Sequence, residues 1–203
     1  MKKHVFLFVV FFLNFMAFAV GRFSPLGLSW VSSVGKTMRQ DQQFPDREDY
    51  VYGFRLAFLS GAHSRMVGLA TAVFANEDAT ANGYVGGFQT ASLFNTAGDC
   101  ELGVWQISGF YNMISMNCNG FQVCSSYNDV DGYLNGLQVA IYNEVKSDCT
   151  GAQIGLFNRG GNALGLQIGV LNFAKSLQGL QVGVLNFVDE SKMAMFPAIR
   201  IGW

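Results

Sequence analysis

The sequence predicts an all-β repeat protein, in the form of a parallel β-solenoid with one repeat of 14–17 residues in each coil. Three observations predict this fold. A short motif recurs along most of the chain, apolar and polar residues alternate within each copy, and charged residues gather in the segments between copies. These features are typical of a stack of similar coils.

The motif is clearest near the C-terminus, where it follows the template Gly-x-Gln-(Ile/Val)-Gly-x-x-Asn closely. Regular copies span residues 136–143, 151–158, 165–172 and 179–186. Looser copies span 87–95, 104–112 and 120–128, a degenerate copy spans 68–76, and residues 53–60 begin the array. The asparagines that close the copies stand at 76, 95, 112, 128, 143, 158, 172 and 186, so their spacing shrinks from 19 to 14 residues.

Within each copy, alternation with a period of two indicates a β-strand. In residues 165–172, Leu166, Ile168 and Val170 point to one side, and the glycines and Gln167 point to the other. A helix is excluded because two glycines in eight residues would cost about 2 kcal/mol of helix propensity. In a solenoid we expect the Leu, Ile and Val side chains to fill the interior, each contributing about 1.5–3 kcal/mol.

Coils stacked about 4.8 Å apart place identical residues over one another, and this predicts two ladders of side-chain amides. We expect an asparagine ladder at one turn and a glutamine ladder on the glycine-lined face. The members in the regular copies are Asn143, Asn158, Asn172, Asn186, Gln138, Gln153, Gln167 and Gln181.

An antiparallel arrangement is the alternative fold, in the form of a small outer-membrane β-barrel whose Leu, Ile and Val side chains face lipid. Strands of about ten residues and the terminal aromatic Trp203 suit it. Successive copies nevertheless all run from Gly to Asn without a two-strand period, and Thr90, Ser92 and Ser125 would face lipid. The direction of the copies therefore favours the solenoid. As a function, the alternative implies an anchor or a narrow channel.

The first residues are typical of a bacterial export signal. Lys2 and Lys3 precede an apolar stretch that ends in Ala-Phe-Ala at 17–19, which predicts a cleaved signal peptide over residues 1–19. We expect a leader segment over residues 20–50 and a β-repeat domain over residues 51–203.

Composition argues against nucleic-acid binding and against catalysis. The formal net charge is −1, charged residues make up 13% of the chain, and no basic stripe is present. After signal removal, His63 is the sole histidine, in a short connector, and neither a catalytic triad nor a metal-ligand spacing accompanies it. We therefore predict no enzyme activity, no catalytic residue, no cofactor, no metal site and no nucleic-acid partner.

Cys100, Cys118, Cys124 and Cys149 remain after signal removal, and an exported protein permits disulfides. Cys118 and Cys149 both lie four residues before a motif glutamine, but one coil separates them. That separation of about 9.6 Å is too long for a disulfide. Cys100 and Cys118 lie on neighbouring coils, so we hypothesise a Cys100–Cys118 disulfide.

Aromatic residues concentrate in the middle copies. They have two interpretations, namely the filling of wider coils or an exposed strip that binds a glycan or a protein partner. The residues are Phe88, Trp105, Phe110, Tyr111, Phe121, Tyr127 and Tyr142.

At these motifs the sequence resembles a bacterial surface-repeat family of leptospires and other diderm bacteria. Its members combine an export signal, an opening Gly-(Phe/Leu)-Arg-Leu segment, tandem Gly-Leu-Gln-x-Gly-x-x-Asn repeats and a short Pro-containing end. The resemblance covers residues 53–56, the copies from 87 to 186, and residues 196–197. The four cysteines and the irregular copies before residue 130 depart from the pattern. The resemblance implies a location at the cell surface or outer membrane, and it carries over no activity or ligand.

Together these observations predict a non-catalytic cell-surface or outer-membrane protein that serves as a structural or adhesion-like interaction surface. The expected partner is a protein or glycan of the envelope, with association with the outer membrane as a further expectation. Self-association through the solenoid ends is also expected, since an uncapped end presents unpaired strand edges.

Overall fold

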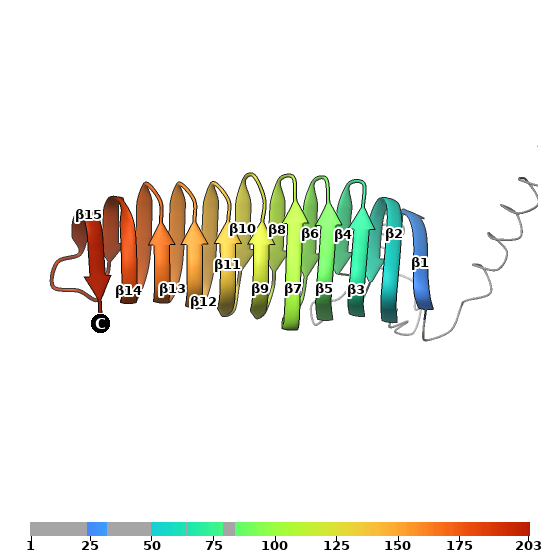
Figure 1. The fold of residues 1–203 in the computed structure, drawn as a ribbon, viewed down its shortest axis with the longest axis horizontal. Helices are drawn as coiled ribbons and strands as arrows, with labels where there is room; N and C mark the ends of the chain where they lie inside the picture. Colours follow the sequence, from blue (N-terminus) through green and yellow to red (C-terminus); the bar gives the residue numbers. More distant parts are fainter. Residues whose placement is uncertain (1–23, 32–49, 64, 79–83) are drawn as a thin grey trace, which may run out of the picture.

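The computed structural model describes residues 24–31, 50–63, 65–78 and 84–203, so the expected signal peptide at 1–19 lies outside the described residues. The described residues form a row of stacked coils (Figure 1). The first strand falls within the 20–50 stretch that was expected to be a leader. The strands are β1 (Ser24–Val31), β2 (Tyr50–His63), β3 (Arg65–Ala72), β4 (Ala75–Asp78), β5 (Tyr84–Ala91), β6 (Phe94–Ala97), β7 (Cys100–Ser108), β8 (Tyr111–Ile114), β9 (Cys118–Val123), β10 (Tyr127–Val130), β11 (Leu134–Val139), β12 (Tyr142–Ile154), β13 (Phe157–Ile168), β14 (Leu171–Val188) and β15 (Met195–Gly202).

Each coil contributes a strand to a front layer and a shorter strand to a back layer (Figure 1). In the middle of the row, β3, β5, β7, β9 and β11 form the front layer, and β4, β6, β8 and β10 form the back layer. From β12 onward, single long strands bend around the coil and take part in both layers.

Successive coils pair in parallel and in phase with the motif. Gly136 pairs with Gly151, Gly151 with Gly165, and Gly165 with Gly179. Among the described strands, the pairings from β1 to β14 are parallel and the last, β14 with β15, is antiparallel. The predicted parallel β-solenoid is confirmed and the antiparallel alternative is wrong. Each copy with its connector makes one complete turn, so all copies run in the same direction.

The first glycine of each regular copy lies in close contact with the coil before it. Gly165 has a φ of +139°, and a Cβ atom there would lie 2.1 Å from the carbonyl oxygen of Gly151. Gly179 repeats this relation to Gly165, also at 2.1 Å. Neither the backbone conformation nor the space admits a side chain. Glycine in this column therefore allows the coils to stack.

The two faces of the motif are oriented opposite to the expectation. Ile168 and Val170 are 39% and 41% exposed, whereas Gln167 is 2% exposed. The expected filling of the interior by the Leu, Ile and Val faces is therefore wrong, and the glycine–glutamine face points inward. Backbone carbonyl oxygens of both layers accept hydrogen bonds from the ladder side chains, as those of Phe173 and Val182 do. Slender amide side chains can bond to these carbonyls, which aliphatic side chains would leave unpaired.

The glutamines form a ladder that also ties the two layers together. Gln167 Nε2 donates to Gln153 Oε1 at 2.7 Å and to the backbone carbonyl oxygen of Phe173, in the back layer, at 3.2 Å. The ladder begins upstream of the regular copies, at Gln89. In the same way Gln106, Gln122, Gln138, Gln153, Gln167 and Gln181 each donate to the glutamine of the preceding coil. The predicted glutamine ladder is confirmed, inside the coil.

The asparagines form the second ladder, where the chain turns from the front layer to the back layer. Asn158 Nδ2 donates to Asn172 Oδ1 and to the carbonyl oxygen of Ile168, both at 2.8 Å. Its own Oδ1 accepts a hydrogen bond from Asn143 at 2.9 Å. The side chain thus supplies the donor that a carbonyl at the turn lacks. The predicted ladder is confirmed, and it runs through Asn76, Asn95, Asn112, Asn128, Asn143, Asn158, Asn172 and Asn186.

Two apolar columns fill the rest of the interior. They face each other across the coil and contribute most of the buried apolar side chains. One column contains Met66, Val85, Cys100, Cys118, Leu134, Cys149, Ala163 and Leu177, and the other contains Ala97, Ile114, Val130, Val145, Ala174 and Val188. The apolar core is therefore only two side chains wide.

The strand β15 closes the C-terminal end of the stack. It pairs antiparallel with β14 and places Arg200 opposite Gln181. Arg200 is 9% exposed and donates to two carbonyl oxygens of the preceding loop. Pro197 has no N–H group and Ala198 has a φ of 64°, so the outer edge of β15 is interrupted. This end of the stack is capped.

Replacing one rung of the asparagine ladder is expected to destabilise the whole stack. Asn158→Ala removes the acceptor for Asn143 and the donors for Asn172 and the Ile168 carbonyl. Each buried group left unpaired costs about 1–3 kcal/mol. We expect the free energy of unfolding to fall by about 3 kcal/mol or more, measured by urea denaturation followed by circular dichroism.

The matched control is Asn135→Ala, because Asn135 is exposed on the outside of the front layer. Its expected loss is within about 0.5 kcal/mol. Equal losses in the two variants would contradict the assignment of stability to the ladder.

Candidate interaction surface

The outward side of the front layer is an apolar face. Residues on either side of each motif glutamine point out of the coil because the glutamine points in. Stacking aligns them in two columns of nine residues, which together are called the front face. The first column is Phe54, Leu69, Phe88, Trp105, Phe121, Leu137, Ala152, Leu166 and Leu180, and the second is Leu56, Thr71, Thr90, Ile107, Val123, Val139, Ile154, Ile168 and Val182.

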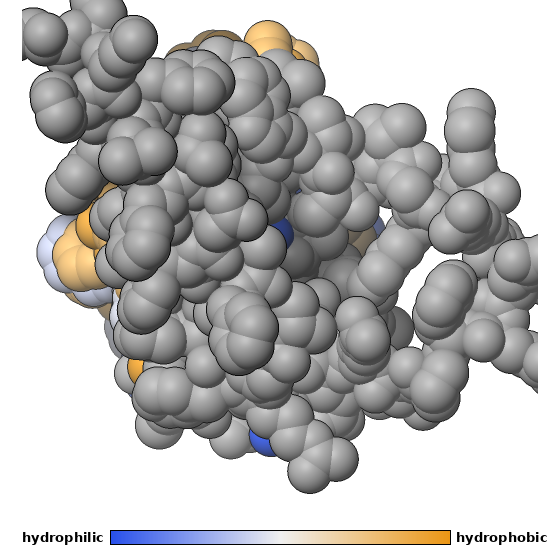
Figure 2. Space-filling view, turned by 90° about the vertical axis from the view of Figure 1, so that its right-hand side faces the viewer, coloured by the Kyte–Doolittle hydropathy of each residue, from blue (hydrophilic) through white to orange (hydrophobic). Residues whose placement is uncertain are grey.

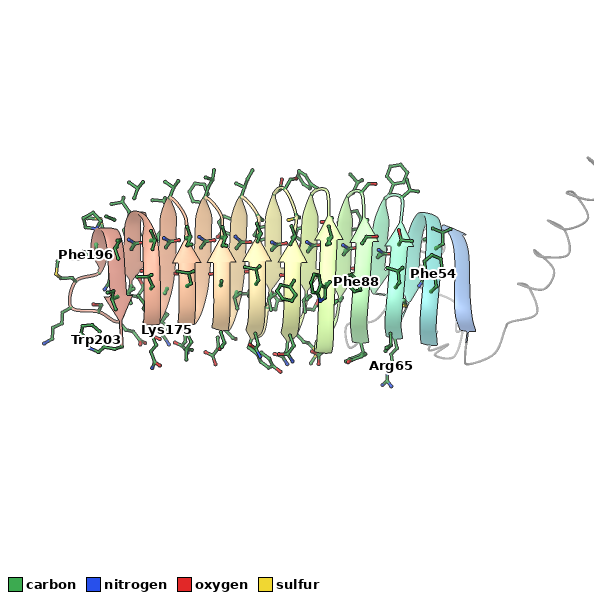
Figure 3. The ribbon with its side chains drawn as sticks, viewed as in Figure 1. Phe54, Arg65, Phe88, Lys175, Phe196 and Trp203 are labelled. Carbon is green, nitrogen blue, oxygen red and sulfur yellow. The ribbon has the colours of Figure 1, made fainter. Side chains whose placement is uncertain are left out.

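The front face is open to solvent along the stack. Phe54 is 37% exposed, Trp105 is 45% exposed and Ile107 is 43% exposed. Figure 3 shows Phe54 and Phe88 on this side of the ribbon. None of the eighteen front-face residues is charged. Soluble proteins expose single apolar residues everywhere, but a continuous apolar face of this length is typical of a contact surface.

A third apolar column, called the upper ridge, lies at the turn two residues before each ladder asparagine. Figure 2 looks along the stack from the β1 end, and hydrophobic residues appear at the left, the side of the front face, and at the top. The upper ridge adjoins the front face and widens it. Its apolar members are Phe74, Leu93, Phe110, Ile141, Leu156, Val170 and Val184, which are 41–64% exposed.

The opposite turn, called the lower edge, is polar. Lys146 forms an ion pair with Asp131, and Lys175 forms one with Glu190 at 3.5 Å. Figure 3 shows Arg65 and Lys175 at this edge. Exposed pairs contribute at most about 1 kcal/mol each, so the lower edge is a solvated border. The coil is therefore amphipathic in cross-section.

The aromatic residues of the middle coils lie outside the core. Phe88, Trp105 and Phe110 are 44%, 45% and 61% exposed, and the other four are half-buried. The filling of wider coils is therefore wrong, and the structure shows exposed aromatic strips. Phe88, Trp105 and Phe121 form a row of tilted rings on the front face, with ring centroids 5.2 and 4.5 Å apart. On the back layer, Tyr127 stacks on Tyr111 at 5.5 Å and contacts Tyr142 at a tilt, at 5.1 Å.

The four cysteines lie buried inside the stack. Cys100 and Cys118 are direct partners on adjacent coils. Leu134 separates Cys118 from Cys149, as the sequence predicted. Burial raises the pKa of the Cys118 thiol to about 12, with Asp99 adding to the shift, and burial alone raises the pKa of Cys149 to about 12. These thiols, where not oxidised, therefore stay neutral near pH 7 while the stack is closed.

The Cys100–Cys118 disulfide stays a prediction. Cys149 is an internal reference for a reduced cysteine, because its neighbours in the column are Leu134 and Ala163 and neither can form a disulfide with it. The protein from an oxidising compartment is unfolded without reductant, alkylated and mapped by mass spectrometry. We expect alkylation at Cys124 and Cys149 and one disulfide-linked peptide pair. Cys100→Ser should make Cys118 available, and alkylation of all four cysteines in the unchanged protein would exclude the disulfide.

Carboxylates gather on the back layer around Asp129. This residue is 6% exposed, pairs with Glu144 of the next coil, and has an Oδ1 atom that accepts no hydrogen bond. Burial raises the pKa of Asp129 to about 6; Lys146 opposes the shift, and Asp131 and Glu144 add to it. Among the described residues, no group of three or more His, Cys, Asp or Glu side chains is placed to hold a metal ion. The cluster is therefore expected to affect the free energy of unfolding rather than to bind a metal ion.

We expect Asp129→Asn to stabilise the protein near neutral pH. The raised pKa means that folding favours the protonated acid, so the stability from this site is present below pH 4 and is lost as the pH rises through 6. Asp129→Asn has no carboxyl group at this position, so it does not lose stability as the pH rises. The free energy of unfolding should rise by about 1–2 kcal/mol at pH 7, since solvent screens part of the charge, and change little at pH 4.

Denaturation at both pH values measures this effect, and Asp148→Asn on the exposed lower edge is the control. We expect the control to leave the stability unchanged at either pH. A loss of stability in Asp129→Asn at pH 7 would contradict the assignment.

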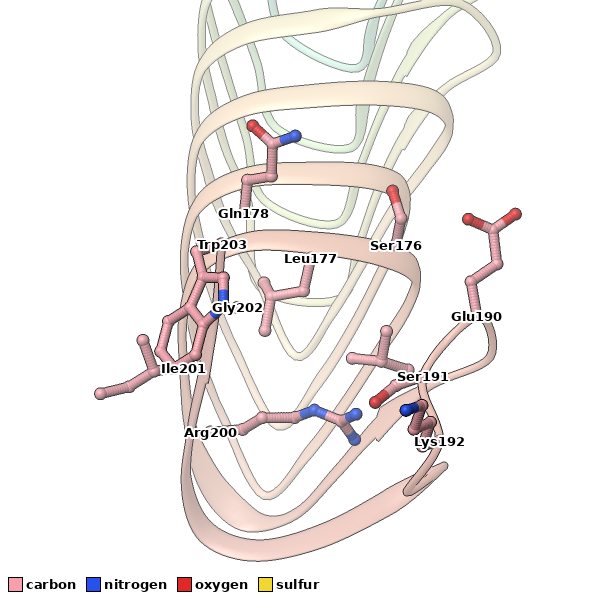
Figure 4. Close-up of a pocket in the computed structure, with 11 residues that line it drawn as sticks. Ser176, Leu177, Gln178, Glu190, Ser191, Lys192, Arg200, Ile201, Gly202 and Trp203 are labelled. Carbon is pink, nitrogen blue, oxygen red and sulfur yellow. The ribbon is translucent and has the colours of Figure 1, made fainter.

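Two hollows lie away from the front face. One of about 480 Å³ lies at the C-terminal end, where Figure 4 shows Arg200 reaching toward the loop that carries Ser191. Leu177 lines it and is the last member of an apolar column, so this hollow lies between the last coil and the strand β15 that caps it. The other, of about 830 Å³, lies on the back layer beside Gly160 and Gly161, which have no side chains.

The remaining sequence predictions and the comparisons add little to this picture. His63 was expected in a connector. It is instead the last residue of β2 and pairs with Asp78 of β4. In the part of the chain that the structure describes, no helix has the length and apolar character needed to cross a membrane. Comparisons with protein-family models, curated proteins and solved structures gave no match.

Proposed function

We propose that this protein is an exported, non-catalytic component of the envelope of a diderm bacterium, where it serves as a structural or adhesion-like interaction surface. The observation that carries the proposal is the front face, which is exposed, apolar and uncharged along nine coils. Water in contact with such an area is unfavourable, so contact with a partner that covers it lowers the free energy.

The construction of the coil suits this role. The glutamine and asparagine ladders fix the front layer from behind, so its side chains are positioned before any partner arrives. A preformed surface loses little conformational entropy on binding. The row of Phe88, Trp105 and Phe121 adds exposed aromatic area, which supports contact with a protein or a glycan of the envelope.

The location is argued from the sequence. Residues 1–19 have the features of an export signal, and the repeats resemble those of a bacterial surface-repeat family. Both support a place at the cell surface or the outer membrane.

Fractionation of the producing cells tests the proposal. We expect the mature chain, shortened by residues 1–19 in mass spectrometry, to be in the envelope fraction and to be released by carbonate or urea. Ile154→Lys, which places a charge on the front face, should reduce this retention, whereas Ser147→Lys on the lower edge should not. An unprocessed chain in the cytoplasm, or equal retention of both variants, would contradict the proposal.

A further inference from the structure

We propose that the front face is covered by the front face of a second copy, so that two solenoids pack sheet against sheet as a two-fold dimer. This inference rests on the proposed function, because it names the partner of the same interaction surface. Four features of the structure support it, namely the area of the face, its composition, the covered C-terminal end and the placement of charge.

The area of the front face matches what a stable dimer needs. Nine coils about 4.8 Å apart give a length of roughly 40 Å. Across each coil, the two columns and the upper ridge span four to five residues, or roughly 13–17 Å at about 3.3 Å per residue. The product is roughly 500–700 Å² on each copy, which reaches the lower part of the range of about 600–1,000 Å² per partner for a standard interface.

The composition is that of an interface with an apolar centre and a polar rim. Trp105 and Phe121 lie near the middle of the face, with ring centroids 4.5 Å apart. Below the glycine column, the next outward positions of the regular copies are Asn135, Thr150, Leu164 and Gln178, which are exposed and uncharged, and three of the four are polar. These amides and hydroxyls can pair across a two-fold axis without burying a charge.

The C-terminal end of the stack is a poorer surface for self-association than the front face. The C-terminal end is covered by β15, whose outer edge is interrupted at Pro197 and Ala198. Face-to-face contact places the two front layers about 10 Å apart with strands rotated by about 30°. It uses the same patch on both copies, so the assembly closes at two.

A lipid surface is the competing occupant of the front face, and the charges disfavour it. Apolar faces that lie on membranes are bordered by lysine and arginine residues that meet anionic headgroups. The lower edge instead mixes both signs, with Asp131 and Asp148 beside Lys146 and Lys175. A border of this kind gives no attraction to an anionic membrane.

Sedimentation equilibrium of the purified mature protein without detergent, from 1 to 50 µM, tests the proposal. We expect twice the monomer mass, unchanged in 1 M sodium chloride because the front face carries no charge. Val123→Lys places a charge near the middle of the face at a side chain that is 36% exposed, and it should weaken dimerisation at least 100-fold. Ile168→Lys is a second face variant, in case the first fails to fold as judged by circular dichroism. Ser147→Lys on the lower edge should remain a dimer.

Three outcomes would overturn the proposal. If the protein is a monomer and floats with phosphatidylglycerol vesicles in a density gradient, a lipid surface covers the front face. If it is a monomer at 50 µM and binds no vesicles, neither a second copy nor a lipid surface covers the face. Oligomers that persist in both face variants place self-association at the stack ends. A monomer that is still retained at the envelope defeats this inference alone, whereas a dimer found unprocessed in the cytoplasm defeats the proposed function alone.

Discussion

The buried side-chain amide is the group on which the rest of this structure depends. An amide inside a ladder, such as that of Asn158, uses one N–H group and its oxygen along the stack and the other N–H group on a backbone carbonyl. An amide costs free energy to bury unless these partners are present. The partners of one coil belong to the coils before and after it. The coils are therefore stable together, and the ladder converts a chain of local motifs into one cooperative body.

The two ladders point in opposite directions. Gln167 donates toward the N-terminal end of the stack, to Gln153, whereas Asn158 donates toward the C-terminal end, to Asn172. The aligned amide dipoles of one ladder thus oppose those of the other, and added coils do not build up a field along the axis. The last residue of the glutamine ladder, Gln181, has no following glutamine to donate to its Oε1 atom. The first residue of the asparagine ladder, Asn76, likewise has no preceding asparagine to donate to its Oδ1 atom, and both oxygens are unpaired.

The parallel stack, its register and the members of both ladders were predictable, because identical residues at a regular spacing can align only in phase. The orientation of the coil was not predicted correctly. Alternation divides a strand into two faces without saying which is inside, and the general preference for buried aliphatic residues favoured Leu166 and Ile168 over Gln167. A signal for the true orientation was present in the sequence. The column next to the glutamines varies in size from Ala152 to Trp105, which a close-packed interior does not tolerate, whereas the glutamine column hardly varies.

The constant part and the variable part of each coil have different consequences for how such a chain changes length. The glutamine follows the first glycine by two residues in the regular copies, while the spacing between ladder asparagines falls from 19 to 14 residues. Extra residues are thus absorbed outside the strand that carries the motif. Within the motif, a single inserted residue would move the glutamine to the outer face and break the ladder. Duplication of a whole copy, in contrast, adds one coil and extends the molecule by about 4.8 Å without changing any other coil. Gene duplication or deletion of whole copies therefore changes the length of this protein in steps of one repeat.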